Sequence, residues 1–285
     1  MRRPERLRRR IEAALTARGV EYEHAYTNAP GHGPELVAEA LARGFRRFLV
    51  AGGDGTVREA VTALAGSDAT LALIPVGTGN QLAANLGVPR RLGGSIKTAL
   101  DGDVRRIDLG IVNGRPFTSI VGAGLDAEIV RPEPRIKRRV GYLAYIHAAT
   151  VAALSPKPAL IRIELDDGQV ISGRGLGVEI MNMRGLTAPG LPRPVPVVPH
   201  ARMDDGKLDG CLFLAESTLG YFSVLGDILT RRYEKSPRLR YFSGKRIVVS
   251  AEPPLRTQAD GELLGETPFE VGVWPLALKV LVPAS

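Results

Sequence analysis

The sequence predicts an α/β plus all-β protein of two domains, and two observations support that expectation. Through the first hundred residues, apolar runs of strand length alternate with stretches of helical periodicity, which is typical of a parallel sheet covered by helices. From about residue 105 onward, strand-like runs follow one another across short glycine-bearing turns, which is typical of antiparallel strands. The predicted domains therefore span residues 1–105 and 106–285.

Helices and strands alternate in the first domain. Apolar residues between Leu7 and Leu15 recur at helical intervals, and Gly19 is suited to end that helix. A second helix is expected to start near Pro34, a residue favoured in the first turn, and to stop at Gly44. The other expected elements are strands over 20–27, 46–53 and 70–77 and helices over 57–64 and 80–87.

Two hairpins organise the start of the second domain. Asn113-Gly114 is the strongest short hairpin signal in the chain, and a second turn is expected at Asp166–Gly168. One helix is expected over 137–154, and the five prolines of 187–200 predict a loop. Further strands are expected over 207–216, 245–252 and 276–283.

Composition limits the class of protein. The chain has 285 residues, of which 44% are hydrophobic, so it can bury a sizeable core. The single cysteine, Cys211, excludes an internal disulfide and suits a reducing compartment. The start of the chain is rich in arginine and has no apolar stretch typical of a signal peptide. The longest apolar run, 142–154, is too short to cross a bilayer.

The net charge of +8 is concentrated in three basic clusters, at residues 1–10, 131–142 and 231–246. Such clusters suit an anionic lipid surface, a phosphorylated ligand or a nucleic acid, and equally an ordinary solvated surface. The chain contains no RNA-binding motif and few aromatic residues among the basic ones, so we expect no nucleic-acid partner. Its four histidines are scattered and indicate no zinc site.

Two glycine-rich turns, "AGGDGTVRE" at 51–59 and "PVGTGN" at 75–80, each follow a predicted strand. In an open parallel sheet, ligands bind beyond the carboxyl ends of the strands. Glycine lets the backbone approach a ligand, and the N–H groups at the start of the following helix favour an anion. The turns predict a phosphate site with one wall from Gly52, Gly53, Gly55 and Thr56 and another from Gly77, Thr78 and Gly79.

Asp54 lies inside the first of these turns, where bound phosphates would repel it. Mg²⁺ between the carboxylate and the phosphates would remove the repulsion, or Asp54 could polarise an attacking hydroxyl. Either use indicates phosphoryl transfer from a nucleotide. The glycines could instead serve only the tight turns, since neither turn has a Walker A or GxGxxG spacing.

Together, the motifs resemble those of the soluble bacterial diacylglycerol kinase-like lipid kinases, which are related to sphingosine and ceramide kinases. The resemblance rests on the two glycine turns, "GAGLDAEIV" with "KRRVGYLAYI", "DDGKLDG" and "QADGELLGETPFEV", in that order from about residue 20 to the end. It implies a parallel-sheet α/β nucleotide-binding domain and an antiparallel β-sandwich domain that carries the lipid site, with the active site in the cleft between them.

The resemblance also assigns roles to residues. It implies nucleotide contacts for Thr27, Gly52, Gly53, Asp54, Gly55, Thr56, Val57, Arg58, Gly77, Thr78, Gly79 and Asn80. It places the catalytic carboxylates at Asp54, Asp260 and Glu262, with Glu262 slightly favoured as the general base. A structural Mg²⁺ would take the Asp205 carboxylate with the Arg202 and Lys207 carbonyls, and Asp108 would belong to the metal–water network.

The expected function is that of an ATP- and Mg²⁺-dependent lipid kinase. It would transfer the γ-phosphoryl group to a hydroxyl of a diacylglycerol-like or sphingoid-like lipid at an anionic membrane surface. Because a lipid hydroxyl has a very high pKa, a carboxylate must accept its proton as the bond to phosphorus forms. We expect a cytoplasmic protein, held peripherally at the inner face of the membrane, with a homodimer as an open possibility.

Three departures from the family pattern bear on this expectation. First, the chain begins at the first helix, without the strand and "NPxSG" turn that usually precede it in the family. Second, Arg58 stands where the family commonly has asparagine. Third, Gln81 stands where the family often has aspartate. Because a missing first strand would impair ATP binding, one alternative is a catalytically impaired regulator that binds nucleotide or lipid. Another is an NAD kinase, which shares "GGDGT" but would be expected to carry an "NE" dipeptide that this chain lacks.

Overall fold

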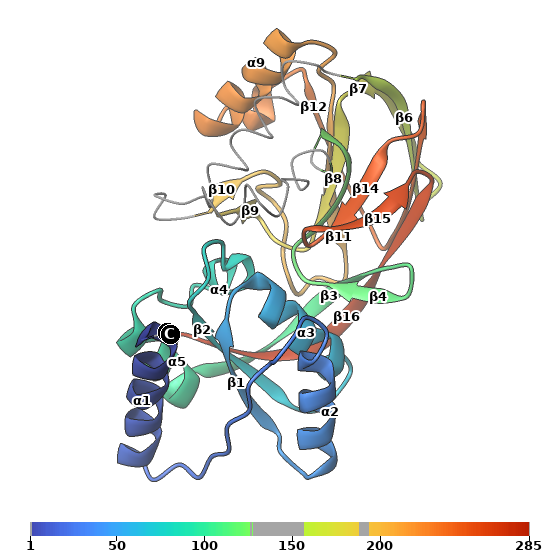
Figure 1. The fold of residues 1–285 in the computed structure, drawn as a ribbon. Helices are drawn as coiled ribbons and strands as arrows, with labels where there is room; N and C mark the ends of the chain where they lie inside the picture. The colour runs from blue at the N-terminus through green and yellow to red at the C-terminus, as the bar shows by residue number, and fades with distance from the viewer. Residues whose placement is uncertain (1, 126, 128–156, 188–193, 285) are drawn as a thin grey trace.

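The computed structural model describes residues 2–125, 127, 157–187 and 194–284. Figure 1 shows two lobes stacked end to end, with the helices α1 to α5 in the lower lobe and most of the β-strands in the upper one. The predicted helix over 137–154 lies outside the described residues. No helix among the described residues is long and apolar enough to cross a membrane.

The lower lobe is a sheet with helices on both faces. Its helices and first strands are α1 (Arg2–Ala17), α2 (Gly33–Ala42), β1 (Arg47–Gly52), α3 (Asp54–Leu64), β2 (Thr70–Pro75), α4 (Gln81–Asn85) and α5 (Leu92–Asp101). Strands β1 and β2 are parallel, as the alternation of elements predicts. Leu71 of β2 packs in one cluster with Val61 and Leu64 of α3, whereas Ala72 packs with Ala99 of α5. Successive residues of the strand therefore face opposite layers.

The last strand of the chain completes this sheet. Strand β16 (Phe269–Val282) returns to the lower lobe and pairs in parallel with β2 at Lys279 and Val280. Strand β3 (Asp103–Val112) pairs antiparallel with β16 over most of its length. Because β3 and β16 both reach the upper lobe (Figure 1), these two strands join the lobes within the described part of the chain. The division at residue 105 stays a prediction.

The upper lobe is a β-sandwich. One sheet continues from β16 through β13, β6 and β7, and the other has the order β12-β11-β8-β5-β14-β15. Buried residues of both sheets, such as Ile161, Val178 and Val249, share one apolar cluster. The further elements are β4 (Arg115–Phe117), β5 (Ile120–Gly124), β6 (Ala159–Leu165), β7 (Val170–Gly175), β8 (Gly177–Met181), β9 (Gly185–Leu186), β10 (Val195–Pro196), β11 (Leu208–Phe213), α9 (Thr218–Leu229), a 3₁₀ turn (Tyr233–Lys235), β12 (Leu239–Gly244), β13 (Arg246–Glu252), β14 (Arg256–Ala259) and β15 (Glu262–Glu266).

The predicted fold class and both hairpins are confirmed, and one predicted strand is wrong. Asn113 and Gly114 have φ of 50° and 73° between β3 and β4, and Gly168 has φ of 84° between β6 and β7. Residues 20–27, in contrast, form no strand and are exposed throughout. A strand needs a hydrogen-bonded neighbour and a buried face, and among the described strands β1 pairs with β2 alone.

Candidate active site between the lobes

The two glycine turns touch each other directly. A Cβ atom at Gly77 would lie 2.5 Å from the Cα atom of Gly53, and one at Gly79 would lie 2.5 Å from Oδ2 of Asp54. Neither position has room for a side chain unless the turns separate. The glycines at 53, 77 and 79 are therefore explained by the close approach of the two turns, whether or not a ligand is bound.

Asp54 joins the two turns. Its Oδ2 accepts a hydrogen bond from the Asn80 N–H at 2.8 Å, and its Oδ1 accepts one from the Gln81 N–H at 2.6 Å. The backbone of Asn80 is in the left-handed region, with φ of 58°. Its side chain accepts a hydrogen bond from the Gly77 N–H at 2.9 Å and donates one to the Gly77 carbonyl at 2.6 Å. The aspartate thus caps the start of α4 and fixes the second turn against the first.

The start of α3 is open, in contrast to that of α4. Its N-cap is Gly53, which has no side chain to cap the helix, and no side-chain acceptor for the N–H groups of the first turn is found among the described residues. The helix is 11 residues long, so its dipole adds to the positive potential of these N–H groups. Among the described residues, this is the end of the glycine turns that suits an anion such as a phosphate.

Arg58 reaches from α3 to the upper lobe. Its guanidinium donates a hydrogen bond to Oε1 of Glu262 on β15 and another, at 3.3 Å, to the carbonyl oxygen of Asp260. Since Asp54 and Arg58 are four residues apart on α3, their side chains lie on the same face of the helix. The structure therefore brings the predicted base Glu262 into the cluster that contains the glycine turns.

Asp260 has a different environment from Glu262. One of its carboxylate oxygens accepts from the N–H and hydroxyl of Thr118 at 2.7 and 3.0 Å, and the other from the N–H groups of Ser119 and Ile120 at 2.9 and 3.1 Å. Burial raises the pKa of the Asp260 carboxyl, although these hydrogen bonds oppose the shift. The carboxylate fixes the start of β5, while the side chain of Glu262 is 57% exposed.

Gln81 forms a second bridge between the lobes. Its Oε1 accepts from the Thr187 N–H at 2.7 Å, its Nε2 donates to the Thr187 carbonyl at 3.4 Å, and the Thr187 hydroxyl donates to the carbonyl of Gly79 at 2.9 Å. Asn85, one turn further on, donates to the Gly185 carbonyl at 2.9 Å. Both residues that depart from the family pattern inside the motifs, Arg58 and Gln81, thus contact the opposite lobe.

The predicted metal residues surround one turn. Asp108 is fully buried, and its two oxygens accept from the N–H groups of Gly206 and Leu276, each at 2.7 Å. Asp205 is exposed and accepts from the N–H of Lys207 at 3.2 Å, while Arg202 is exposed on the same turn. Among the described residues, no three His, Cys, Asp or Glu side chains gather as a metal cluster.

The remaining predicted nucleotide contacts are dispersed. Thr27 lies in the exposed stretch before α2, and no hydrogen bond of its side chain is found among the described residues. The Val57 side chain belongs to the buried core, so only its backbone faces the turn. The Thr78 carbonyl accepts from Arg90 at 3.0 Å. Sequence reasoning missed Thr187 and Thr118, which no local pattern marks because their partners are distant in the chain.

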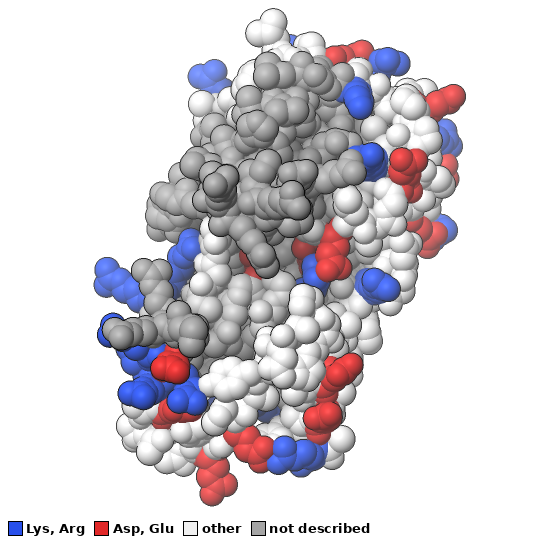
Figure 2. Space-filling model, in the orientation of Figure 1, with Lys and Arg blue, Asp and Glu red and all other residues white. Residues whose placement is uncertain are grey.

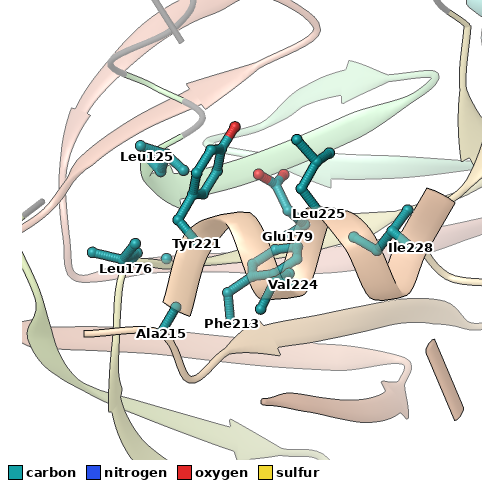
Figure 3. Close-up of a pocket in the computed structure, with 10 residues that line it drawn as sticks. Leu125, Leu176, Glu179, Phe213, Ala215, Tyr221, Val224, Leu225 and Ile228 are labelled. Atoms are coloured by element: carbon teal, nitrogen blue, oxygen red, sulfur yellow. The ribbon is translucent and has the colours of Figure 1, made fainter. Parts of the chain in front are cut away.

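An apolar pocket lies in the upper lobe between α9 and the strands β8 and β11 (Figure 3). Its volume is about 160 Å³. Nine of its ten lining residues carry no charge, and the exception is Glu179 of β8, whose carboxylate points into the space between Tyr221 and Leu225 in Figure 3. A pocket of this character suits an alkyl chain.

Family models and relatives agree with this architecture. Residues 2–112 match the diacylglycerol kinase catalytic domain, and residues 119–282 match the YegS C-terminal NAD kinase beta sandwich-like domain. A diacylglycerol kinase of Bacillus subtilis is 30% identical over 88% of this chain and 82% of its own. A Pseudomonas aeruginosa protein named "Probable lipid kinase YegS-like" is 30% identical over 96% of this chain and 90% of its own.

A solved structure supports the fold. The crystal structure of a diacylglycerol kinase from Bacillus anthracis superimposes with a TM-score of 0.75 at 24% identity, over 95% of this chain and 91% of that one. The chain spans only 55% of a longer uncharacterized Synechocystis protein to which it is 29% identical. From the two domain models and these relatives, the chain belongs to the family of diacylglycerol kinase-like lipid kinases.

Proposed function

We propose that the chain transfers the γ-phosphoryl group of ATP to a lipid hydroxyl at a membrane surface, with the reaction in the cleft between the lobes. One observation carries the proposal beyond family membership. The open N-terminus of α3 and the Glu262 carboxylate belong to different lobes, and Arg58 brings them into one cluster. A phosphate site beside a carboxylate from the other lobe is what phosphoryl transfer to a hydroxyl requires.

The glycine turns would hold the ATP phosphates. The N–H groups of Asp54, Gly55 and Thr56 in the first turn of α3 would donate to phosphate oxygens, with the hydroxyls of Thr56 and Thr78 beside them. These residues fit an anion because, within the part of the chain that the structure describes, no side chain caps this helix. The segment that contains Thr27 would line the same side.

Magnesium would be held by few protein ligands, as is usual when phosphates and water complete its shell. Asp54 would supply a carboxylate oxygen, because each oxygen accepts one hydrogen bond from the described residues and retains a lone pair. When bound, Mg²⁺ neutralises the charge that develops on the phosphates. Asp205, with the carbonyls of its turn, is the candidate for a structural ion, and Asp108 would shape that turn through its two backbone bonds.

Glu262 would accept the proton of the lipid hydroxyl. Its side chain is 57% exposed and is held by Arg58 of the other lobe, whereas both oxygens of Asp260 already accept hydrogen bonds from residues 118–120. We therefore assign Asp260 a positioning role: it fixes the turn from which Glu262 projects. The lipid tail would lie against the apolar pocket beneath α9, which gives the upper lobe its part in substrate binding.

The test is transfer of labelled phosphate from ATP to lipids in mixed micelles. The panel contains diacylglycerol, a sphingoid base, phosphatidylglycerol and a polyprenol. We expect product with at least one lipid, and we expect Glu262→Gln to lower kcat by roughly 100-fold or more, as the loss of a general base does. Glu266→Gln on the same strand is the matched control and should retain parental activity.

Two results would count against the proposal. No transfer to any lipid, together with tight ATP binding, would favour the alternative of a catalytically impaired regulator. The pairing of Arg58 with the predicted base is consistent with that alternative. Transfer to NAD in place of lipid would identify a nucleotide kinase. Equal activity of Glu262→Gln and Glu266→Gln would remove Glu262 from the mechanism but leave the kinase assignment standing.

A further inference from the structure

Helix α9 presents an apolar ridge to solvent at the upper end of the molecule (Figure 1). Leu219 is 83% exposed, Phe222 49% and Leu225 37%, and their spacing of three residues places them along one side of the helix. Val224 and Ile228, on the other side, are buried in the core. An exposed row of large apolar side chains on one element is typical of an interaction surface, whereas isolated exposed residues are ordinary.

Basic residues follow the ridge immediately. The side chains of Arg231, Arg232 and Lys235 are exposed, and within the described part of the chain they make no ion pair or hydrogen bond. Residues 216–240 contain five Lys and Arg but three Asp and Glu. The three acidic ones are all engaged: Glu216 with Arg174 at 3.2 Å, Glu234 with His200 at 3.2 Å, and Asp227 with the Ser236 hydroxyl at 2.6 Å.

Helix α9 and the residues that follow it therefore combine exposed apolar side chains with positive charge that no ion pair among the described residues neutralises. Figure 2 shows a few uncharged atoms at the very top of the molecule, with basic and acidic side chains near them. The surface of an ordinary soluble protein would complement only one of these two features. The headgroup boundary of an anionic bilayer satisfies both, because apolar side chains enter the acyl region while Lys and Arg remain among the anionic headgroups.

The pocket lies directly beneath this surface. Leu225 belongs to both, since it is exposed on the ridge and also lines the pocket with Tyr221 (Figure 3). Strand β5 runs from the pocket end to the reaction end, where the Ile120 carbonyl accepts from the Asp260 N–H. The four residue steps of β5 from Ile120 to Gly124 span about 13 Å at 3.3 Å each, and Leu125 of the pocket follows directly. An extended acyl chain could bridge that distance.

We propose that the ridge Leu219–Phe222–Leu225 and the cations Arg231, Arg232 and Lys235 form the docking surface of this protein for an anionic lipid bilayer. The inference deepens the proposed function and rests on it: a lipid would leave the docked leaflet beside α9, keep its tail in the pocket and carry its hydroxyl along β5 toward Glu262. The docking face would thus be the end of the upper lobe remote from the glycine turns.

Vesicle sedimentation tests the surface without any need for catalysis. The parent chain is mixed with vesicles of equal parts phosphatidylcholine and phosphatidylglycerol, or of phosphatidylcholine alone. We expect binding to the anionic vesicles that weakens as salt is added. Each basic residue near an anionic leaflet contributes about fivefold in affinity, so the combined Arg231→Gln, Arg232→Gln and Lys235→Gln variant should bind roughly 100-fold more weakly.

Matched variants separate this surface from the general positive charge of the chain. The combined Arg6→Gln, Arg9→Gln and Arg10→Gln variant removes the same charge from exposed positions of α1, and it should bind like the parent. The double variant Leu219→Ser, Phe222→Ser should bind at least tenfold more weakly, since it removes two apolar side chains from the bilayer. Leu160→Ser, at a position 52% exposed on β6, is its control.

A local probe reports whether α9 itself enters the bilayer. The chain has one tryptophan, Trp274, in the lower part of the fold, so Phe222→Trp adds a second emitter on the ridge. We expect its emission to shift to shorter wavelength with anionic vesicles, while the parent signal stays constant. An unchanged spectrum, or equal loss of binding by the α1 and α9 charge variants, would overturn the proposal. A dimer that buries Phe222 in the absence of lipid would overturn it as well.

Activity on a short-chain diacylglycerol dispersed as monomers distinguishes failure of the docking surface from failure of the proposed kinase function. If the α9 variants phosphorylate the monomeric lipid normally but not vesicle lipid, both the kinase and its docking surface stand. If they phosphorylate both equally, the docking surface is wrong and the kinase remains. If the parent chain phosphorylates neither, the proposed function fails, and the vesicle-binding result is judged by itself.

Discussion

Arg58 places a cation beside the carboxylate that we propose as the base. It lies one helical turn after Asp54 and holds Glu262 and the Asp260 carbonyl from the opposite lobe. Its side chain is 24% exposed, so water reaches the pair and its contribution to stability is small, of the order of 1 kcal/mol or less. Its larger effect is expected on geometry, since it fixes where Glu262 points.

Replacing Arg58 tests this positioning role. Arg58→Asn removes both hydrogen bonds, and because a displaced catalytic group costs up to about 100-fold, we expect kcat to fall by roughly 10- to 100-fold. The KM for lipid should change little, and so should the thermal midpoint. Steady-state kinetics and a thermal scan measure these quantities. A kcat above that of the parent would show instead that the pair blocks the base.

Cys211 gives a second prediction at the scale of single residues. It is fully buried on β11, and burial raises the pKa of its thiol to about 12. A thiol reagent at pH 8 should therefore react with the native chain far more slowly than with the unfolded one, in which one thiol reacts. Immediate reaction of the native chain would contradict the buried placement of β11.

The same shift makes stability depend on pH. Because the folded-state pKa lies above the ordinary value of 9.0, the folded chain keeps its proton where the unfolded chain loses it. The contribution of Cys211 to stability is complete below pH 9 and decreases as the pH rises toward 12. Cys211→Ser should flatten this alkaline decrease in chemical denaturation experiments.

At the scale of elements, the contact of the two glycine turns positions the site. Gly77→Ala would place a methyl group 2.5 Å from the Cα atom of Gly53 and force the turns apart. We expect a loss of about 1–3 kcal/mol in unfolding free energy, as for other overpacked sites, together with weaker ATP binding. Denaturant titration and calorimetric binding measure the two effects.

Gly93→Ala is the control for that variant. A Cβ atom at Gly93 meets nothing within 4 Å, and the residue lies in α5, where alanine is the better helix former. It should be as stable as the parent or slightly more so. If Gly77→Ala were equally harmless, the turns would not be in the contact described here, and Asp54 would lose its explanation as the cap of α4.

Local chemistry was sufficient to predict many elements. Asn113-Gly114 gave a hairpin because two adjacent residues with positive φ suit its turn, and the turns at 51–59 and 75–80 fell at strand ends as the apolar runs indicated. The strand expected over 20–27 was wrong because its pattern carried no information about a partner strand. Pairing of β16 with β2 joins residues two hundred positions apart, which no periodicity reveals.

The candidate site likewise has parts that the sequence could predict and parts that it could not. The glycines and Asp54 could be recognised as a site from their order, but the capping bonds of Asp54 to Asn80 and Gln81 cross between two turns and needed the structure. Arg58 and Gln81 were visible as departures from a family pattern. That both reach the opposite lobe could not be predicted, because each partner lies more than one hundred residues further along the chain.

At the scale of the whole molecule, two of the described strands and several side chains connect the lobes. Strands β3 and β16 form the covalent and hydrogen-bonded link, and Arg58, Gln81 and Asn85 close the gap around the glycine turns. The reaction we propose needs the phosphates from one lobe and the base from the other. The relative position of the lobes therefore determines whether the site is assembled.

A crystal structure of the chain with ADP and Mg²⁺ tests that claim most directly. The account predicts the terminal phosphate of ADP at the first turn of α3, bound by the backbone N–H groups of Asp54, Gly55 and Thr56, with Glu262 facing it from β15. Nucleotide bound away from both glycine turns, with the start of α3 open to water and Glu262 turned away from it, would contradict it.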